Sequence, residues 1–472
     1  MVRTPEVPII TGIKPILEMD VHVRSISVSG NARMKLQYFQ NELKELDRFR
    51  GNPSKLREQI SIAQSRLTST GLFDEVEIKV VPLDSYDVQM EVMVKEKGIP
   101  FLKIESNVKA NSGLSNDVGF EVQGALRSPL GLGEFVRLTV GSGSSGSQNN
   151  SLVATAPLYI NDKPYRGHIS LRSSSENNSY YLSYKQKISN ILAMIETVGG
   201  RSNHSFSCEI AHRDEIPINY TNIPHQQAYN VSSAVLYNLA SSSKVLAKYS
   251  WFFDTRDSAA NPSNGKFINS SVEVALPPGS AQFLRSEITL QNHQTLGPSV
   301  FDQPGLVGSV CGHLGVIYPL NREKSLHVSD RYHNGGPMSI RGFDYYGVGA
   351  RGDPNTGGNI NGDSVGGMSK LNLIALLSMP IPQKTAAAAG GRVFVHCNIG
   401  SIGPLVYWKS SNFLTPNIFG LAFDNLRASL GGGVSFQIMN SIRLEMSYSL
   451  PLLRASHDVL KPFQIGVGMT IN

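Results

Sequence analysis

The sequence predicts a membrane all-β fold: an antiparallel transmembrane β-barrel of about 16 strands, preceded by one small α+β domain. Two observations lead to this prediction. From about residue 100 onward, apolar and polar residues alternate in segments that Gly-, Asn- and Ser-rich stretches separate. Before that point, apolar residues recur at helical as well as strand spacing. We therefore expect an N-terminal extension over 1–20, a small domain over 21–97 and the barrel over 98–472.

The composition excludes several other classes of protein. No long uninterrupted apolar run occurs, so a transmembrane helix is not expected, whereas alternating barrel strands escape such a search. The net charge of +6 is spread along the chain without a Lys/Arg block, so no nucleic acid is expected as a partner. The 3 cysteines lack metal-ligand spacing, and we expect neither a metal site nor a disulfide framework.

The first twenty residues carry neither a secretory signal nor an Arg/Ser-rich transit peptide. A barrel without a bacterial export signal indicates a eukaryotic organelle, and the missing transit-like segment favours mitochondria over plastids.

The small domain is expected to follow the order strand, helix, helix, strand, strand. Alternation predicts a strand over 21–30, and a short polar helix follows over roughly 35–46. A second amphipathic helix ends at Gly71, and alternation returns over 75–80 and 88–94.

This segment resembles a POTRA domain. The resemblance rests on Gly30 and Asn31 after the first strand, and on Gly71, Phe73 and Val76 before the next long strand. A generic small αβ domain remains the alternative. The resemblance implies an open sheet edge that accepts an extended client segment by strand addition.

In the second part of the chain, charged residues stand in the middle of predicted strands. Arg443 and Glu445 alternate with apolar neighbours, which suits a water-filled lumen with lipid outside, although a soluble sandwich alternates too. We count roughly sixteen or seventeen candidate strands. An odd number would make the first and last strands pair in parallel. We therefore choose sixteen and assign the weak candidate around 231–239 to a long loop.

A long Gly-rich stretch, about 321–368, separates two predicted strands. Its motif resembles the inward-folded loop of the POTRA-plus-barrel family that assembles outer-membrane proteins (BamA-like). The matching residues are a double glycine and a hydrophobic-Arg-Gly-Phe tetrapeptide: Gly335, Gly336, Ile340, Arg341, Gly342 and Phe343.

A loop of this length needs internal anchors, and an arginine in the lumen offers several donors. The family's acidic partner is replaced here by Asn398, in a strand motif that ends at Gly400. This departure leaves a neutral hydrogen bond to Asn398 or another acceptor such as Glu445 for Arg341. The alternative is that Arg341 is an exposed loop residue.

Two further motifs resemble the same family. Asp254, Arg256 and Asp257 match a strand end followed by a turn; the two carboxylates also suit a catalytic pair, but no other residue supports hydrolase chemistry. Near the C-terminus a polar-x-Gly-x-x-hydrophobic-x-hydrophobic pattern resembles the mitochondrial β-signal, although an ordinary amphipathic strand also fits. Its residues are Gln464, Gly466, Met469 and Ile471.

Within the family, one POTRA domain makes the chain most like the core barrel subunit of the mitochondrial sorting and assembly machinery (SAM complex). The resemblance implies an insertase in the mitochondrial outer membrane, with the POTRA domain facing the intermembrane space. Its implied partners are β-barrel precursor proteins, peripheral SAM complex subunits and the lipid bilayer. It also implies a lateral gate between the last strand and the first, which contains Phe101, Leu102 and Ile104.

No enzyme activity and no cofactor are expected, because nucleotide-binding motifs are missing and the histidines are scattered. Two alternatives stay open, and a third, an enzyme, finds no support in the sequence. A chloroplast outer-envelope barrel of the same family would share every motif. A passive pore would lack the POTRA-like domain and the Arg-Gly-Phe loop. An outer-membrane lipase or protease would need a catalytic constellation that we do not find.

Overall fold

The structure is a computed structural model. Its contacts divide the chain into two compact units, the first comprising Met1–Lys103, Gly124–Arg137 and Val153–Gly167 and the second comprising the rest. Ile471, the last residue of the predicted β-signal, lies outside the described residues. Those residues are 20–31, 33–47, 49–83, 86–109, 117–143, 146–161, 163–178, 181–198, 201–217, 232–236, 239, 241–321, 326–352, 361–403, 407–410, 413–416, 425–438 and 442–469.

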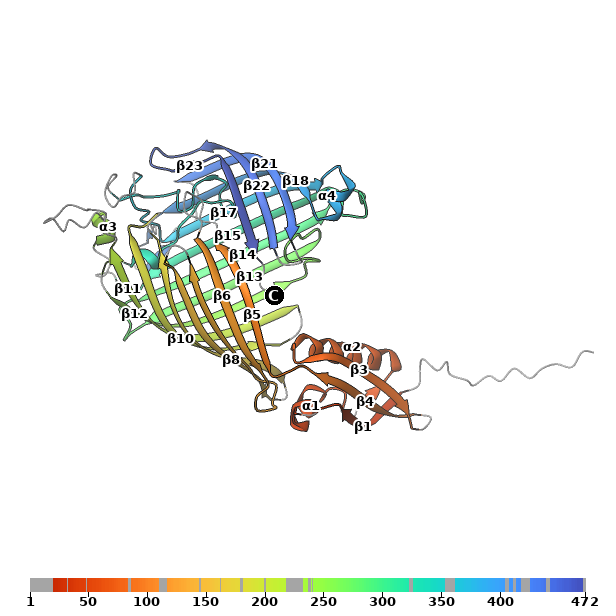
Figure 1. Ribbon diagram of the computed structural model, residues 1–472. Helices are drawn as coiled ribbons and strands as arrows, with labels where there is room; N and C mark the ends of the chain where they lie inside the picture. The colour runs from red at the N-terminus through yellow and green to blue at the C-terminus, as the bar shows by residue number, and fades with distance from the viewer. Residues whose placement is uncertain are drawn as a thin grey trace, which may run out of the picture. The chain divides into compact units, whose positions relative to one another are not determined.

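The small N-terminal domain contains a four-stranded sheet with the order β2-β1-β4-β3 (Figure 1). β1 pairs with β4 in parallel, and β3 pairs with β4 antiparallel. The expected order of elements is present, with a two-residue strand added between the helices. In chain order the elements are β1 (Val21–Ser29), α1 (Leu36–Glu42), β2 (Arg50–Gly51), α2 (Pro53–Ser69), β3 (Phe73–Pro82) and β4 (Asp87–Glu96).

Local sequence explains two of these boundaries. At the start of α2 the side chain of Asn52 accepts a hydrogen bond of 2.8 Å from the amide of Ser54, and Pro53 takes the first helical position. Gly30 ends β1 with a φ of 81°, and a Cβ there would lie 2.0 Å from the carbonyl oxygen of Val94. Only glycine fits this turn.

In the rest of the chain, the described residues contribute sixteen strands to one large sheet. From β10 to β24 all neighbouring strands are antiparallel. The strand order is β24-β22-β21-β18-β17-β15-β14-β13-β12-β11-β10-β9-β8-β7-β6-β5, so β5 and β24 stand at its two ends (Figure 1). The strands are β5 (Pro100–Lys109), β6 (Asp117–Arg127), β7 (Phe135–Gly143), β8 (Gln148–Ile160), β9 (Lys163–Asn177), β10 (Tyr184–Thr197), β11 (Ser202–Pro217), β12 (Ser242–Asp254), β13 (Gly265–Leu276), β14 (Phe283–Thr295), β15 (Val307–Pro319), β17 (Ser369–Pro380), β18 (Arg392–Gly403), β21 (Leu426–Ile438), β22 (Ile442–Leu453) and β24 (Phe463–Met469).

Where the connections between these strands are described, their helices and strands are short. The weak strand candidate around 231–239 contains the helix α3 (Ser233–Leu236), and the described residues of this range contribute no strand to the large sheet. Among the described residues, no helix is both long enough and apolar enough to cross a membrane. The remaining short elements are η2 (Val328–Asp330), β16 (Gly342–Phe343), α4 (Lys384–Ala388), β19 (Tyr407–Ser410), β20 (Phe413–Pro416) and β23 (Leu460–Lys461).

The two faces of the large sheet differ in polarity, and β18 shows the difference clearly. Val395 is 56% exposed, whereas its neighbour His396 is 2% exposed, and Asn398 is buried on the same side as His396. Successive strand residues point to opposite faces, so apolar side chains line the exposed face and polar ones the covered face. This is the reverse of the pattern in a soluble sheet.

The segment 321–368, which we call the long loop, connects β15 to β17, and its described residues cover part of the polar face. Its buried residues Ile340 and Phe343 pack in one cluster with Phe283 of β14 and Ile402 of β18. Within the long loop, β16 pairs antiparallel with β23, which immediately precedes the last strand.

The exposed apolar face gives a test of the membrane interpretation. Val395→Arg is expected to destabilise the protein by up to about 2–4 kcal/mol in a bilayer, because the strand would carry a charge into hydrocarbon. The folded fraction in lipid vesicles, followed by heat-modifiable gel mobility, measures this loss. Val395→Leu is the matched control and should fold normally. An arginine tolerated as well as the leucine would contradict a lipid-facing position.

Candidate functional site: the long loop and the last strands

Arg341 of the long loop is buried and forms an ion pair with Glu445 in the middle of β22. Its Nε lies 2.5 Å from Oε1 of Glu445, and its Nη2 lies 3.1 Å from Oε2. Arg443 approaches the same carboxylate, with Nη2 3.3 Å from Oε2. The ring of Phe394 lies within 6 Å of both guanidinium groups, at 5.7 Å and 5.8 Å. Arg341 is therefore an internal anchor, and the interpretation as an exposed loop residue is wrong.

Glu445, one of the two acceptors considered from the sequence, binds Arg341. Asn398, the other one, is buried on the polar face of β18. Gly400 leaves space for the loop, because a Cβ at this position would lie 2.2 Å from Cδ1 of Ile340. Ile340 is fully buried, and the glycine provides the space into which it packs.

The double glycine lets the long loop fold back on itself. Gly335 and Gly336 have φ values of 109° and 108°, a region that favours glycine. A Cβ on Gly335 would lie 2.2 Å from the carbonyl oxygen of Asp344, and one on Gly336 would lie 2.9 Å from the ring of Tyr345. The amide of Gly336 donates to the carbonyl of Phe343 at 3.0 Å. The turn thus holds the Arg-Gly-Phe residues against the start of the motif.

The last strand contacts the motif through the side chain of Gln464. The Gly342 amide donates to Oε1 of Gln464 at 3.1 Å, and Nε2 of Gln464 donates to the Phe343 carbonyl at 2.7 Å. The side-chain amide therefore hydrogen bonds to β16 as a neighbouring backbone would. Gly342 itself has a φ of 88°.

The glycine of the predicted β-signal also faces the long loop. A Cβ on Gly466 would lie 2.9 Å from Cβ of Pro337 and 3.6 Å from Sδ of Met338. Apolar residues of β24 point the other way, where Phe463, Ile465 and Val467 are exposed. The polar-x-Gly pattern therefore marks the face of β24 that the long loop covers. Met469 ends β24, and its side chain lies outside the described part.

The first strand of the large sheet, β5, contains Phe101, Leu102 and Ile104. Leu102 is exposed, and the side chains of the other two lie outside the described part. The two strands named as the gate are thus the two ends of the strand order.

The strand-turn motif stabilises the turn between β12 and β13. Arg256 is paired with Asp254, with Nη2 2.7 Å from Oδ2. Oδ1 of Asp257 accepts hydrogen bonds from the amides of Ser263 at 2.9 Å and Asn264 at 3.2 Å. Both carboxylates are engaged in holding the turn, which is a structural role.

Sequence reasoning missed two further contacts of the long loop. Asn334 and Asn372 exchange side-chain hydrogen bonds of 2.7 Å and 3.1 Å. Asp458, in the connection before β23, accepts from Nε of Arg427 at 2.8 Å and from the Gly349 amide at 3.4 Å. Asn372 gave a sequence signal, because it interrupts an otherwise apolar strand. Asp458 lies in a polar turn and gave none.

Comparison with known proteins identifies the class that this arrangement belongs to. The Omp85 superfamily domain matches residues 129–471, so the chain belongs to the Omp85 superfamily. The structure of BamA from Haemophilus ducreyi lacking POTRA domains 1–3 is similar with a TM-score of 0.71 at 17% identity, covering 95% of this chain and 85% of that one. The predicted BamA-like family and the all-β fold are confirmed.

Individual relatives fit the branch that the motifs indicated. A SAM50-like protein of Schizosaccharomyces pombe is 26% identical over 483 residues, which cover 96% of this chain and 91% of that protein. The human sorting and assembly machinery component 50 homolog is 27% identical over 244 residues, covering 50% of this chain and 48% of that protein.

Loss of the buried ion pair is expected to free the long loop. Arg341→Ala and Glu445→Gln should each destabilise the docked loop by about 3–5 kcal/mol, because removing one partner leaves a buried charge poorly compensated. Limited proteolysis in detergent should then cut the loop faster than in the wild type. Asp302→Asn, in an exposed turn, is the control and should leave cleavage unchanged. Equal cleavage of all four proteins would contradict the anchor.

The contact between Gly400 and Ile340 predicts a compensating pair of substitutions. Gly400→Ala alone should displace Ile340 and lower the melting temperature, since overpacking a tight contact costs about 1–3 kcal/mol. Combining it with Ile340→Ala should restore part of the loss, because the second change vacates the space. Thermal melts of both single variants and the double variant measure this coupling. Strictly additive losses would show that the two residues do not pack together.

Proposed function

We propose that this chain folds and inserts β-barrel precursors into the mitochondrial outer membrane through a lateral gate between β5 and β24. We propose that the large sheet closes at these strands into a barrel of about 16 strands. Membership of the Omp85 superfamily supports the proposal, and so do relatives that are named sorting and assembly machinery components.

The gate works by exchange of hydrogen bonds. A closed barrel has no sheet edge, and parting one seam recreates two edges within the membrane. An incoming precursor strand pairs with β5 and displaces β24, so that each lost backbone hydrogen bond is replaced by an equivalent one. The exchange needs no nucleotide and no cofactor, and we assign the chain no catalytic reaction.

One observation carries the proposal: the long loop contacts the end strand through Gln464 and Gly466. Both contacts belong to a short polar-x-Gly pattern, so another strand with the same pattern can make them. A precursor that takes the place of β24 then meets Gly342, Phe343 and Pro337 in the same way. The long loop thus provides a binding surface for the incoming precursor strand, in addition to covering part of the polar face of the large sheet.

The small domain supplies the first contact with the client. In its sheet order β3 stands at one end, and an extended precursor segment can add there as a further strand. We propose that this POTRA domain faces the intermembrane space. Peripheral SAM complex subunits are the further partners that we propose.

Cysteine pairs scanned along β5 and β24 test the gate in a protein that lacks Cys208, Cys311 and Cys397. Oxidation should lock the seam and stop insertion of a labelled barrel precursor into reconstituted vesicles, and reduction should restore it. Pairs between β10 and β11, which must stay together, are the matched control.

If the locked protein inserts precursors at the normal rate, the lateral-gate mechanism is wrong. High steady conductance without precursor insertion in any redox state would favour a passive pore.

A further inference from the structure

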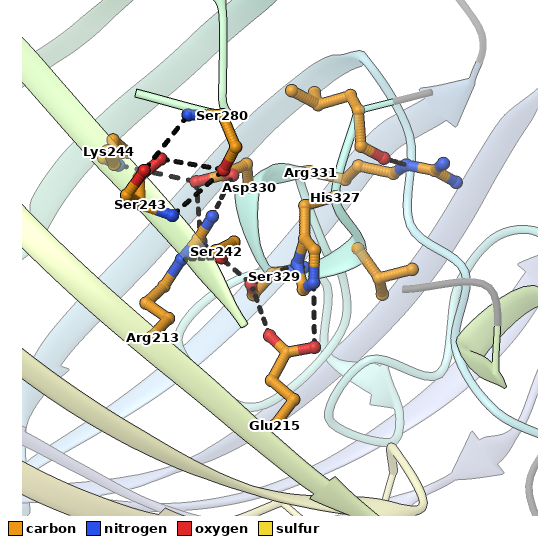
Figure 2. Close-up of polar contacts among 12 residues, drawn as sticks. Arg213, Glu215, Ser242, Ser243, Lys244, Ser280, His327, Ser329, Asp330 and Arg331 are labelled. Atoms are coloured by element: carbon orange, nitrogen blue, oxygen red, sulfur yellow. Dashed lines mark hydrogen bonds and ion pairs between the residues drawn. The ribbon is translucent and has the colours of Figure 1, made fainter. Parts of the chain in front are cut away.

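The long loop is held by a second buried ion pair, at a point away from Arg341. Figure 2 shows Asp330, the last residue of η2, beside Arg213 and Lys244, which project from β11 and β12. Arg213 donates to both carboxylate oxygens, with Nη1 3.0 Å from Oδ1 and Nη2 2.8 Å from Oδ2. Nζ of Lys244 lies 3.4 Å from Oδ1. The side chains of Arg213 and Asp330 are only 6% and 3% exposed.

Asp330 is charged at neutral pH. Burial by itself would raise the pKa of this carboxyl group, but the positive charges of Arg213 and Lys244 outweigh that effect and hold the pKa at about 2. The contact is thus a charge-assisted fork, a geometry that fixes orientation as well as distance.

Beside the ion pair of Arg213 with Asp330, β11 makes a second contact with the long loop, and there β11 supplies the acidic side chain. Glu215 follows Arg213 by two positions on β11, so both side chains point to the same face. Oε1 of Glu215 accepts from Oγ of Ser329 at 3.1 Å, and Oε2 lies 2.8 Å from Nε2 of His327. A shift of the loop that placed Asp330 beside Glu215 would bring two carboxylates together. The alternation of charge therefore selects one register of the loop on β11.

We propose that Arg213 is a second anchor of the long loop, a positioning residue that works together with Arg341. Seven strands (β12, β13, β14, β15, β17, β18 and β21) separate β11 from β22 in the sheet order. The loop is thus fixed to two distant parts of the sheet, at Asp330 and at Arg341. Its effect on precursor insertion rests on the proposed function, because the anchor fixes where the motif meets β24.

A buried ion pair is a stronger determinant of position than of stability. Neutralising one partner leaves a buried charge, whereas replacing both partners by neutral groups removes that penalty. Arg213→Gln and Asp330→Asn should therefore each release the loop, and the double variant should behave more like the wild type than either single one. A role in packing alone would make the two effects add.

Two buried valines serve as reporters of the loop position in a protein without Cys208, Cys311 and Cys397. Val328→Cys lies in η2 near Asp330, and Val348→Cys lies beyond the Arg-Gly-Phe motif; the native residues are 0% and 1% exposed. The rate of maleimide labelling of each cysteine in detergent-solubilised protein measures how often the loop lifts. Arg172→Gln, at an exposed arginine of β9, is the matched control.

Each single variant is expected to raise labelling at both reporters at least about tenfold, and the double variant is expected to remain within about threefold of the parent protein. In reconstituted vesicles the insertion of a labelled precursor should slow in the single variants and recover in the double. That recovery separates positioning by the charge pair from a general loss of packing.

Labelling of Arg213→Gln at the parental rate would overturn the anchor, and so would a double variant with the summed effect of both single ones. Unchanged insertion in a single variant whose loop is released would overturn the link between loop position and activity. A parent protein that inserts no precursor, with labelling as expected, would refute the proposed function and leave the anchor supported.

Discussion

The polar face of the large sheet is the constraint on which the rest of the structure depends. Glu445 and Arg213 lie on this face, covered by protein, and an unpaired buried charge costs several kcal/mol, on the order of the whole stability margin of a domain. The long loop supplies Arg341 and Asp330 as the matching charges. Its path is therefore set by electrostatic complementarity with the sheet, and its displacement would take Asp330 away from Arg213 and leave Glu445 with Arg443.

Small residues let the loop approach closely enough for these pairs to form. Gly400 leaves room for Ile340, and Gly466 leaves room for Pro337. Charge pairs fix the register of the loop, and the glycines fix its height above the sheet. Both features are needed to place the loop. An ion pair weakens with distance, so the charges need the close approach that the glycines allow. The glycines by themselves do not favour one register over another.

The contacts to the last strand are of a different kind. Gln464 uses neutral hydrogen bonds, each of which contributes about 1 kcal/mol net, whereas the anchors at Arg341 and Arg213 are charged and buried. The loop is thus held strongly where it must stay and weakly where the proposed exchange takes place. A strand that can be replaced needs contacts whose loss and replacement nearly balance, and side-chain amide contacts meet this condition.

Much of this architecture follows from local sequence. Two-residue alternation predicted the strands, the turn residues bounded the long loop near residues 320 and 369, and the tetrapeptide motif identified the part of the loop that carries the buried Arg341. Alternation is a property of neighbours along the chain, so it can be recognised without knowing the fold. Glu445 was among the candidate acceptors because a charge in the middle of an apolar strand must face a polar interior.

The pairings themselves were decided by the tertiary structure. Arg213 and Asp330 are 117 positions apart, and Gly342 and Gln464 are 122 apart. Whether such residues meet depends on strand register and on the path of the loop, and a shift of one residue would turn every side chain to the other face. The sequence by itself determined which residues need a buried partner, and only the folded chain determined which partner each of them has.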